Sequence, residues 1–329
     1  MLRKLQQGRA VLMGFAILWI IAYHYNLLDG TPARVFFGNG FLGVEIFIIL
    51  SAFGLCFSLS KDDNYKRFIQ KRILRIFPTW WILISVLLII SIIHGKEHPQ
   101  TLFQYICYYS GLGWWFFSHE IPHVYWSEWY VPTILVLYLV IPYIYKLNNK
   151  ALFINFILFL LGGGLLTHYE IASSLAITYV RIPALIYGVL LYRWYKMEQE
   201  GGITKPHKLF LYTSLTIGII GILLISTGVI DYDLEFIKWS FMLSMPIFSY
   251  LIVVLFEKLK LTSTFTFIGG LTLELYLLHI RNTPLLIAMK VIPNKTIAVC
   301  VTMVLLVFAA YYVQKTISFT TKYISKKFA

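Results

Sequence analysis

Long runs of apolar residues, separated by short polar segments, recur along the whole chain. About twenty apolar residues in a helix are needed to cross a bilayer core of roughly 30 Å. A window of that length predicts ten membrane-spanning helices, at residues 11–28, 41–60, 76–94, 129–146, 151–167, 175–194, 209–229, 236–256, 264–288 and 296–317. The pattern therefore predicts an all-α fold, a polytopic helix bundle with both termini on the same side of the membrane.

The polar segments between these runs are short, and none of them has the length of a second domain. The longest covers residues 95–128 and is rich in Trp, Tyr and His, as at Trp114–Trp115 and Tyr125–Trp126. The sequence shows no internal repeat, Pro-rich linker or soluble appendage. We therefore expect residues 1–329 to form a single integral membrane domain, whose first apolar run is a spanning helix and not a cleaved signal peptide.

The composition excludes the soluble classes of protein. Of the 329 residues, 59% are hydrophobic and 13% are charged, and the mean hydropathy is +0.73. An average soluble domain is about half apolar and roughly a quarter charged. The three cysteines are scattered and lack C-x-x-C spacing, so they form neither a disulfide framework nor a zinc site.

The net charge of +13 is explained by its distribution along the chain. With the N-terminus inside, 21 of the 28 Lys and Arg residues fall in inner segments, as the positive-inside rule requires. Acidic residues gather in one outer segment, at Asp231, Asp233 and Glu235. We therefore expect both termini to be cytoplasmic, and nucleic acid is not needed to explain the charge.

A few ionisable residues lie inside the predicted spans, where they are costly and mark a functional site. They are His24, Glu45, Arg181, Glu274, His279 and Arg281. A rise of about 1.5 Å per residue places His24, Glu45 and His279 at similar height in the outer half of the bilayer. A carboxylate beside an imidazole fixes its tautomer and raises its basicity, so His24 with Glu45 suits a general base.

Other interpretations of these two residues stay open. His24 can be a core histidine bonded to a backbone carbonyl. Glu45 can belong to a structural ion pair with Arg181 or Arg281, because an unpaired carboxylate at that depth is expensive.

A basic cluster precedes the third predicted span. Helical spacing places Arg67, Lys71 and Arg75 on one face, with Arg72 beside them. Because the guanidinium fork binds phosphate through paired hydrogen bonds, the cluster suits a phosphate-bearing ligand. The alternative, which the cluster taken alone favours, is a positive-inside anchor that touches anionic lipid.

We do not expect a metal site. His94/His98 and His119/His123 have the spacing of two ligands on one helix, but both pairs lie in or beside a loop with Gly and Pro. Ser51 lacks the strand–turn–helix context of a nucleophile elbow, and we expect it to pack as a small residue between helices.

Five segments, in this order, resemble the acyltransferase-3 family of integral membrane acyltransferases over nearly the whole chain. They are Gly14–His24 (GFAILWIIAYH), Gly43–Phe53 (GVEIFIILSAF), Arg72–Pro78 (RILRIFP), Trp129–Tyr138 (WYVPTILVLY) and Leu275–His279 (LYLLH). Two positions depart from the family's pattern. Met13 stands where the family commonly has Arg, with Arg9 one helical turn earlier, and Ala52 replaces the usual Gly.

The resemblance implies an acyl-CoA-dependent O-acetyltransferase. An acyl group, usually acetyl from acetyl-CoA, would pass to a hydroxyl of a cell-surface polysaccharide or its lipid-linked precursor, at the plasma membrane of a bacterial-type cell. His24 and Glu45 would be catalytic, and the phosphates of acyl-CoA would bind at Arg72, Arg75, Arg67 and Lys71. The acceptor would contact Trp129, Tyr130, Tyr276, His279 and Arg181. The oligomeric state stays open.

Two functions of other classes also stay open. A bundle with midplane carboxylates and histidines is typical of a proton-coupled transporter that exports a glycan or a small solute. Against it, the sequence shows no inverted repeat and no paired Gly/Pro-broken helices. The third function is a non-catalytic sensing module, which Met13 slightly favours.

Overall fold

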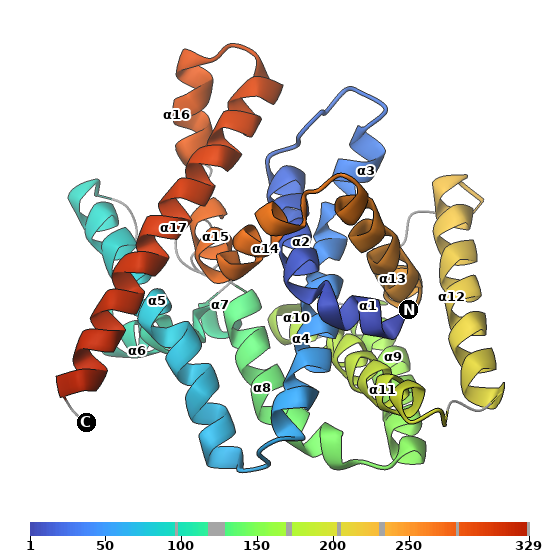
Figure 1. Cartoon of the computed structure of the whole chain (residues 1–329). Coiled ribbons are helices and arrows are strands. Elements are labelled where there is room, and N and C mark those ends of the chain that lie inside the picture. The colour runs from blue at the N-terminus through green and yellow to red at the C-terminus, as the bar shows by residue number, and fades with distance from the viewer. Residues whose placement is uncertain are drawn as a thin grey trace. The chain divides into compact units, whose positions relative to one another are not determined.

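The computed structural model describes residues 1–95, 98–117, 129–168, 173–202, 205–229, 234–280 and 283–327. Every regular element within these ranges is a helix (Figure 1). In chain order these are α1 (Leu2–Gln7), α2 (Arg9–His24), α3 (Arg34–Gly38), the 3₁₀ helix η1 (Gly40–Leu42), α4 (Gly43–Leu59), α5 (Tyr65–Ile93), α6 (Leu102–Ser110), α7 (Gly113–Phe117), α8 (Tyr130–Lys146), α9 (Asn149–His168), α10 (Ser173–Tyr179), α11 (Ile182–Gln199), α12 (Lys205–Ser226), α13 (Leu234–Lys258), α14 (Thr262–Gly270), α15 (Thr272–His279), α16 (Thr283–Val291) and α17 (Lys295–Lys327). Residues named above that lie outside the described ranges are His119, His123, Tyr125, Trp126, Asp231, Asp233 and Arg281.

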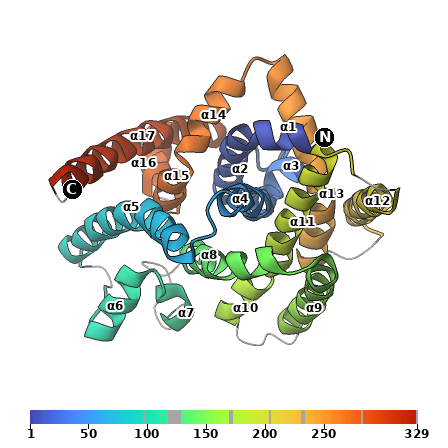
Figure 2. The same ribbon diagram turned by 60° about the horizontal axis from the view of Figure 1, so that its bottom comes forward.

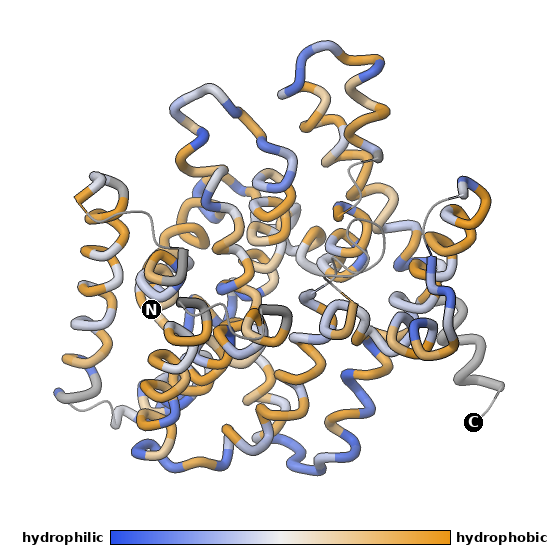
Figure 3. Tube along the Cα trace, turned by 180° about the vertical axis from the view of Figure 1, so that it is seen from behind, coloured by the Kyte–Doolittle hydropathy of each residue, from blue (hydrophilic) through white to orange (hydrophobic). Residues whose placement is uncertain are grey.

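Seven described helical segments are long and apolar enough to cross a membrane. They are Gly40–Leu59, Tyr65–Ile93, Asn149–Leu166, Leu175–Gln199, Lys208–Ile225, Phe236–Lys258 and Lys295–Ser318. Two shorter apolar helices, α2 and α8, coincide with the first and fourth predicted spans. Figure 3 shows hydrophobic residues along the helices and hydrophilic residues at many of the turns between them. The prediction of an all-α, multi-pass membrane protein is thereby confirmed.

The ninth predicted span, residues 264–288, is not one helix. The structure has three short helices there, α14, α15 and α16. Gly269 and Gly270 end α14, and Pro284 lies in the first turn of α16, where the missing N–H of proline is tolerated. Hydropathy averaged over a window does not respond to such breaks, because the residues around them remain apolar. The prediction of a single spanning helix at this place is therefore wrong.

The chain divides into two compact units, which we describe separately. Unit 1 contains Met1–Asp63, Ile141–Ile171 and Val180–Gly270. Unit 2 contains Asn64–Val140, Ala172–Tyr179 and Leu271–Ala329. Each unit is therefore assembled from three separate stretches of the sequence.

In unit 1, glycines let helices approach each other at backbone distance. A Cβ atom at Gly14 of α2 would meet the carbonyl oxygen of Phe265, and one at Gly269 of α14 would meet that of Ala10. Gly188 of α11 packs in the same way on α4. Small residues at such crossings are a common means of helix association in membranes. As a result, α2 contacts both α4 and α14, and α11 contacts α4 (Figure 2).

In unit 2, aromatic side chains hold α6 against α5. The indole N–H of Trp80 donates to the carbonyl oxygen of Tyr108 at 3.3 Å, and that of Trp81 donates to Tyr109 at 2.9 Å. The hydroxyl of Tyr108 donates in turn to the carbonyl oxygen of Ile84 at 3.2 Å. Helices α15 and α17 pack on α5 and on each other, and α16 lies along α17. The packing of α15 on α5 brings together a polar residue of each helix, Thr79 and Glu274.

Candidate active site

His24 is the last residue of α2, and its side chain is exposed. The chain turns immediately afterwards, with positive φ angles at Asn26 (50°) and Leu28 (57°). The imidazole lies edge-on to the neighbouring ring of Tyr23, with 5.1 Å between the ring centroids. The helix predicted over residues 11–28 therefore ends four residues early, and His24 lies at its C-terminal end.

Glu45 forms a buried ion pair with Arg181. Nη1 of Arg181 forms a salt bridge with Oε1 of Glu45. The exposed fractions of Glu45 and Arg181 are 3% and 4%. Glu45 lies in the first turn of α4, where the helix dipole also favours a negative charge. Arg181 directly precedes α11, so the pair joins two helices that pack closely. The sequence left Arg181 and Arg281 open as partners of Glu45, and in the structure the partner is Arg181.

The expected contact between Glu45 and His24 is wrong. Helices α2 and α4 are antiparallel, with Gly40 beside Trp19 and Tyr23, and Gly43 beside Ala16 and Ile20. The same register puts Glu45 level with Ala16. Ala16 lies eight residues before His24 in α2, which is about 12 Å along the helix axis at 1.5 Å per residue. A buried carboxylate also gains more from a permanently charged guanidinium than from an imidazole. His24 and Glu45 therefore differ in height, contrary to the sequence-based estimate.

The basic cluster forms the first three turns of α5. The side chain of Asn64 caps this helix by accepting from the backbone N–H of Arg67 at 2.9 Å. Arg67, Lys71 and Arg75 are exposed, as their predicted common face requires. Arg72 is half-buried, and its guanidinium lies 5.1 Å from the ring centroid of Phe68. Arg72 is thus held by packing, whereas Arg67, Lys71 and Arg75 keep a larger exposed surface.

A second buried carboxylate, Glu274 of α15, lies close to this cluster within unit 2. Its exposed fraction is 5%, and its Oε1 accepts a hydrogen bond from Oγ1 of Thr79 at 3.3 Å. Arg75 interacts electrostatically with Glu274, and also with the hydroxyls of Tyr130 and Tyr138. Two arginines, two phenols and a carboxylate from α5, α8 and α15 thereby interact electrostatically.

The two aromatic segments predicted to bind the acceptor meet in unit 2 as well. The hydroxyl of Tyr276 accepts from the backbone N–H of Tyr130 at 3.4 Å, and their ring centroids are 5.1 Å apart. Trp129 lies edge-on to Tyr130 at 6.0 Å. His279 is buried, 5.7 Å from the ring of Tyr276, and its Nδ1 lies 3.1 Å from the carbonyl oxygen of Leu275. That bond favours the tautomer with the proton on Nδ1.

The sequence alone predicted no particular role for Thr79, Tyr138 or Glu274. The signal for the first two was helical spacing, because Thr79 follows Arg75 by one turn and Tyr138 follows Tyr130 by about two turns. Glu274 was recognised as an ionisable residue in a span, but nothing in the sequence linked it to α5. Its link is a contact between residues far apart in the chain.

Comparison with known proteins adds to this geometry. A protein family described as an acyltransferase domain matches residues 11–315, which includes most of both units. The chain belongs to the acyltransferase-3 family. Its membership, together with the apolar helices, identifies the protein as a multi-pass membrane acyltransferase.

A protein of Acidianus two-tailed virus named "Putative acetyltransferase ORF330" is 24% identical over 294 residues, covering 84% of this chain and 83% of the viral protein. No solved structure gives a significant match.

Membership in the acyltransferase-3 family bears on Arg9, the nearest arginine to Met13. Arg9 begins α2, and its guanidinium lies against Gly54 of α4, where a Cβ atom would collide with it. Arg9 and His24 are therefore at opposite ends of α2, about 22 Å apart at 1.5 Å per residue.

Proposed function

We propose that this acyltransferase moves an acetyl group from acetyl-CoA to a hydroxyl of a cell-surface polysaccharide or its lipid-linked precursor, in the plasma membrane of a bacterial-type cell. Family membership supports the acyl transfer. The observation that carries the proposal further is the grouping of Arg72 and Arg75 with hydroxyl groups inside unit 2.

The arginine cluster is assigned to the donor. Coenzyme A carries several phosphates, and guanidinium groups bind phosphate through charge-assisted hydrogen bonds. Arg72 has a fixed position over Phe68, whereas Arg67, Lys71 and Arg75 are exposed and can neutralise further negative charge. Glu274 interacts electrostatically with Arg75 and so helps to orient this arginine when the donor is absent.

His24 is assigned as the general base. Its imidazole accepts the proton of the acceptor hydroxyl while the hydroxyl oxygen attacks the thioester carbonyl carbon. The bond between that carbon and sulfur then breaks, and the sulfur takes up the proton that the imidazole accepted. Coenzyme A thereby leaves as a thiol, and His24 is neutral again. An exposed imidazole at a helix end is accessible to an incoming hydroxyl, as this step requires.

The acceptor is assigned to the aromatic residues of unit 2. Trp129, Tyr130 and Tyr276 offer ring faces and hydroxyls, the combination that sugar rings need for stacking and hydrogen bonding. His279 adds an imidazole to the same group. Arg181 is engaged by Glu45, so we assign it to the fold and not to the acceptor.

Transfer of label tests the proposal directly. Membranes that contain the protein are incubated with acetyl-CoA labelled in the acetyl group, and the polysaccharide and lipid-linked fractions are then counted. We expect base-labile label in one of these fractions, absent from membranes without the protein. Label that remains entirely in acetyl-CoA, with glycan moved across the membrane, would instead support the transporter.

Arg75→Ala and Arg72→Ala are each expected to raise the KM for acetyl-CoA by about 10–100-fold with a smaller effect on kcat. A hydrogen bond to a charged group contributes about 1.5–3 kcal/mol, and 1.4 kcal/mol corresponds to about tenfold. Steady-state kinetics with each substrate varied in turn measures the effect. Lys66→Ala, an exposed basic residue of the same helix, is the matched control. An unchanged KM for acetyl-CoA with an altered KM for the acceptor would contradict the donor assignment.

A further inference from the structure

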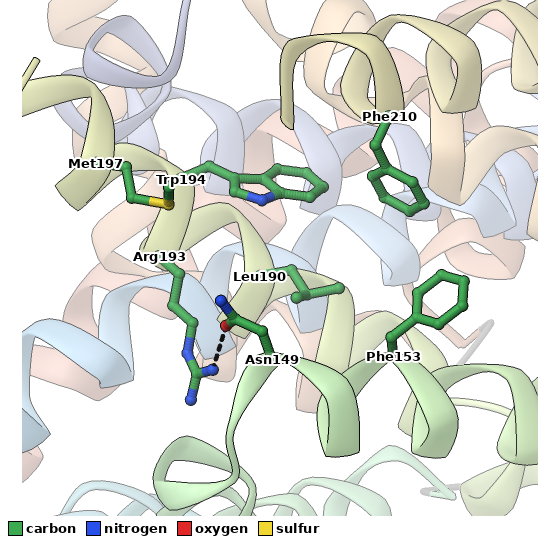
Figure 4. A pocket seen from close by; sticks show the side chains of 7 residues that line it. All are labelled: Asn149, Phe153, Leu190, Arg193, Trp194, Met197 and Phe210. Carbon is green, nitrogen blue, oxygen red and sulfur yellow. Dashed lines mark hydrogen bonds between the residues drawn. The ribbon is translucent and has the colours of Figure 1, made fainter. Parts of the chain in front are cut away.

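Unit 1 contains a cavity of about 190 Å³ among α9, α11 and α12 (Figure 4). Phe153 and Phe210 line it from α9 and α12, and Trp194 and Arg193 line it from α11. None of its lining residues is among those assigned above to catalysis, donor or acceptor. Its lining combines an aromatic part with one cationic end.

The aromatic part is built from three rings in contact. Phe210 lies 5.9 Å from Phe153 and 5.5 Å from Trp194, measured between ring centroids. The spans of α9 and α12 are only 17% and 22% buried, so these two helices turn most of their apolar surface towards the bilayer. The cavity therefore lies between helices that contact lipid, and its walls suit a hydrocarbon chain.

The cationic end is Arg193, which is half-buried. Its guanidinium donates to Oδ1 of Asn149 at 2.6 Å, to the carbonyl oxygen of Tyr145 at 3.0 Å and to that of Leu147. All three acceptors are uncharged, and none of the described carboxylates forms a salt bridge with Arg193. The guanidinium is held in place while its positive charge is not neutralised.

Further charged residues flank the cavity at the end of α8 and in α9, α11, α12 and their connection. With Arg193, these are six basic residues and two acidic ones: Lys146, Lys150, Arg193, Lys196, Lys205, Lys208, Glu198 and Glu200. Lys150, Lys196 and Lys208 are exposed, and each lies within two residues of a residue that lines the cavity. The surplus of positive charge complements an anion at the membrane surface.

We propose that this cavity binds an anionic glycerophospholipid of the leaflet that the basic residues face. One acyl chain occupies the aromatic part, and the phosphate of the headgroup lies at Arg193 and the flanking lysines. Basic pockets between transmembrane helices bind anionic headgroups by this combination of charge and apolar wall. Bound there, the lipid joins α9, α11 and α12 and so stabilises the periphery of unit 1.

Tryptophan quenching by brominated lipid tests the proposal, because Trp194 lines the cavity. The full-length protein is placed in phosphatidylcholine nanodiscs that contain equal fractions of either brominated phosphatidylglycerol or brominated phosphatidylcholine. The difference between wild type and Trp194→Phe isolates the fluorescence of Trp194. We expect brominated phosphatidylglycerol to quench this component more strongly. Equal quenching by the two lipids, or no quenching of this component by either, would overturn the proposal.

Charge variants then test the headgroup site. Each basic residue near a membrane surface contributes about a fivefold preference for anionic lipid, so Arg193→Gln should reduce the preference by about fivefold. Lys258→Gln, an exposed lysine at the end of α13, is the matched control and should leave the preference unchanged. Should Arg193→Gln not fold, the exposed pair Lys150→Gln and Lys208→Gln replaces it. If the preference for anionic lipid is unchanged in these variants, the proposed headgroup site is wrong.

Discussion

Replacement of His24 by alanine is expected to lower kcat by about 10²–10⁴-fold, because the reaction loses its general base. The protein should remain folded, since the side chain is exposed at the end of α2 and contributes little to the core. Turnover of acetyl-CoA by the purified variant, together with its thermal unfolding in the same detergent, measures both quantities.

The control for this variant is His98→Ala, which removes a histidine from the segment that follows α5. It should retain wild-type turnover. The pH dependence offers a second readout, because only neutral imidazole accepts a proton. Wild-type activity should fall on the acid side, and the residual activity of His24→Ala should lack that dependence. Wild-type-like turnover in His24→Ala would remove the assignment.

The second large effect concerns folding. Glu45→Met or Arg181→Met is expected to destabilise the protein by about 3–5 kcal/mol, because each leaves one buried charge without its partner. The double variant Glu45→Met/Arg181→Met should recover most of this loss, since it removes both charges and keeps apolar volume. Unfolding of the four proteins in one detergent gives the coupling between the two residues.

Activity of the same four proteins separates structure from catalysis. If the pair only joins α4 to α11, the double variant should regain specific activity along with its stability. A Glu45→Met protein that is as stable as wild type but inactive would contradict the structural role. It would return Glu45 to the chemistry that the sequence suggested.

The long spans of this protein could be predicted from hydropathy, whereas its breaks could not. The predicted spans 76–94 and 296–317 carry long apolar runs that are recognised without any contact, and they lie in α5 and α17. The end of α2 is different, because Leu27 and Leu28 continue the apolar run beyond the helix. There the backbone turns through positive φ at Asn26 and Leu28, which a hydropathy average does not register.

The candidate site could be predicted as a set of residues but not as a set of contacts. Rarity of charge in apolar helices was enough to select His24, Glu45 and His279. The sequence left two arginines possible as partners of Glu45. The packing of α4 on α11 brings Arg181 to Glu45. The hydrogen bond between Thr79 and Glu274 likewise depends on which face α15 turns to α5.

The crossing of α2 and α14 at Gly14 and Gly269 has a consequence for biosynthesis. These two helices are made about 250 residues apart, which at roughly 5–20 residues per second corresponds to about 12–50 s. Throughout that interval the face of α2 that carries Gly14 cannot contact α14, and it is covered by lipid or by the insertion machinery. Unit 1 is thus completed only after the ribosome has passed residue 270, and a nascent chain that stalls earlier presents α2 to quality control with α4 but without α14.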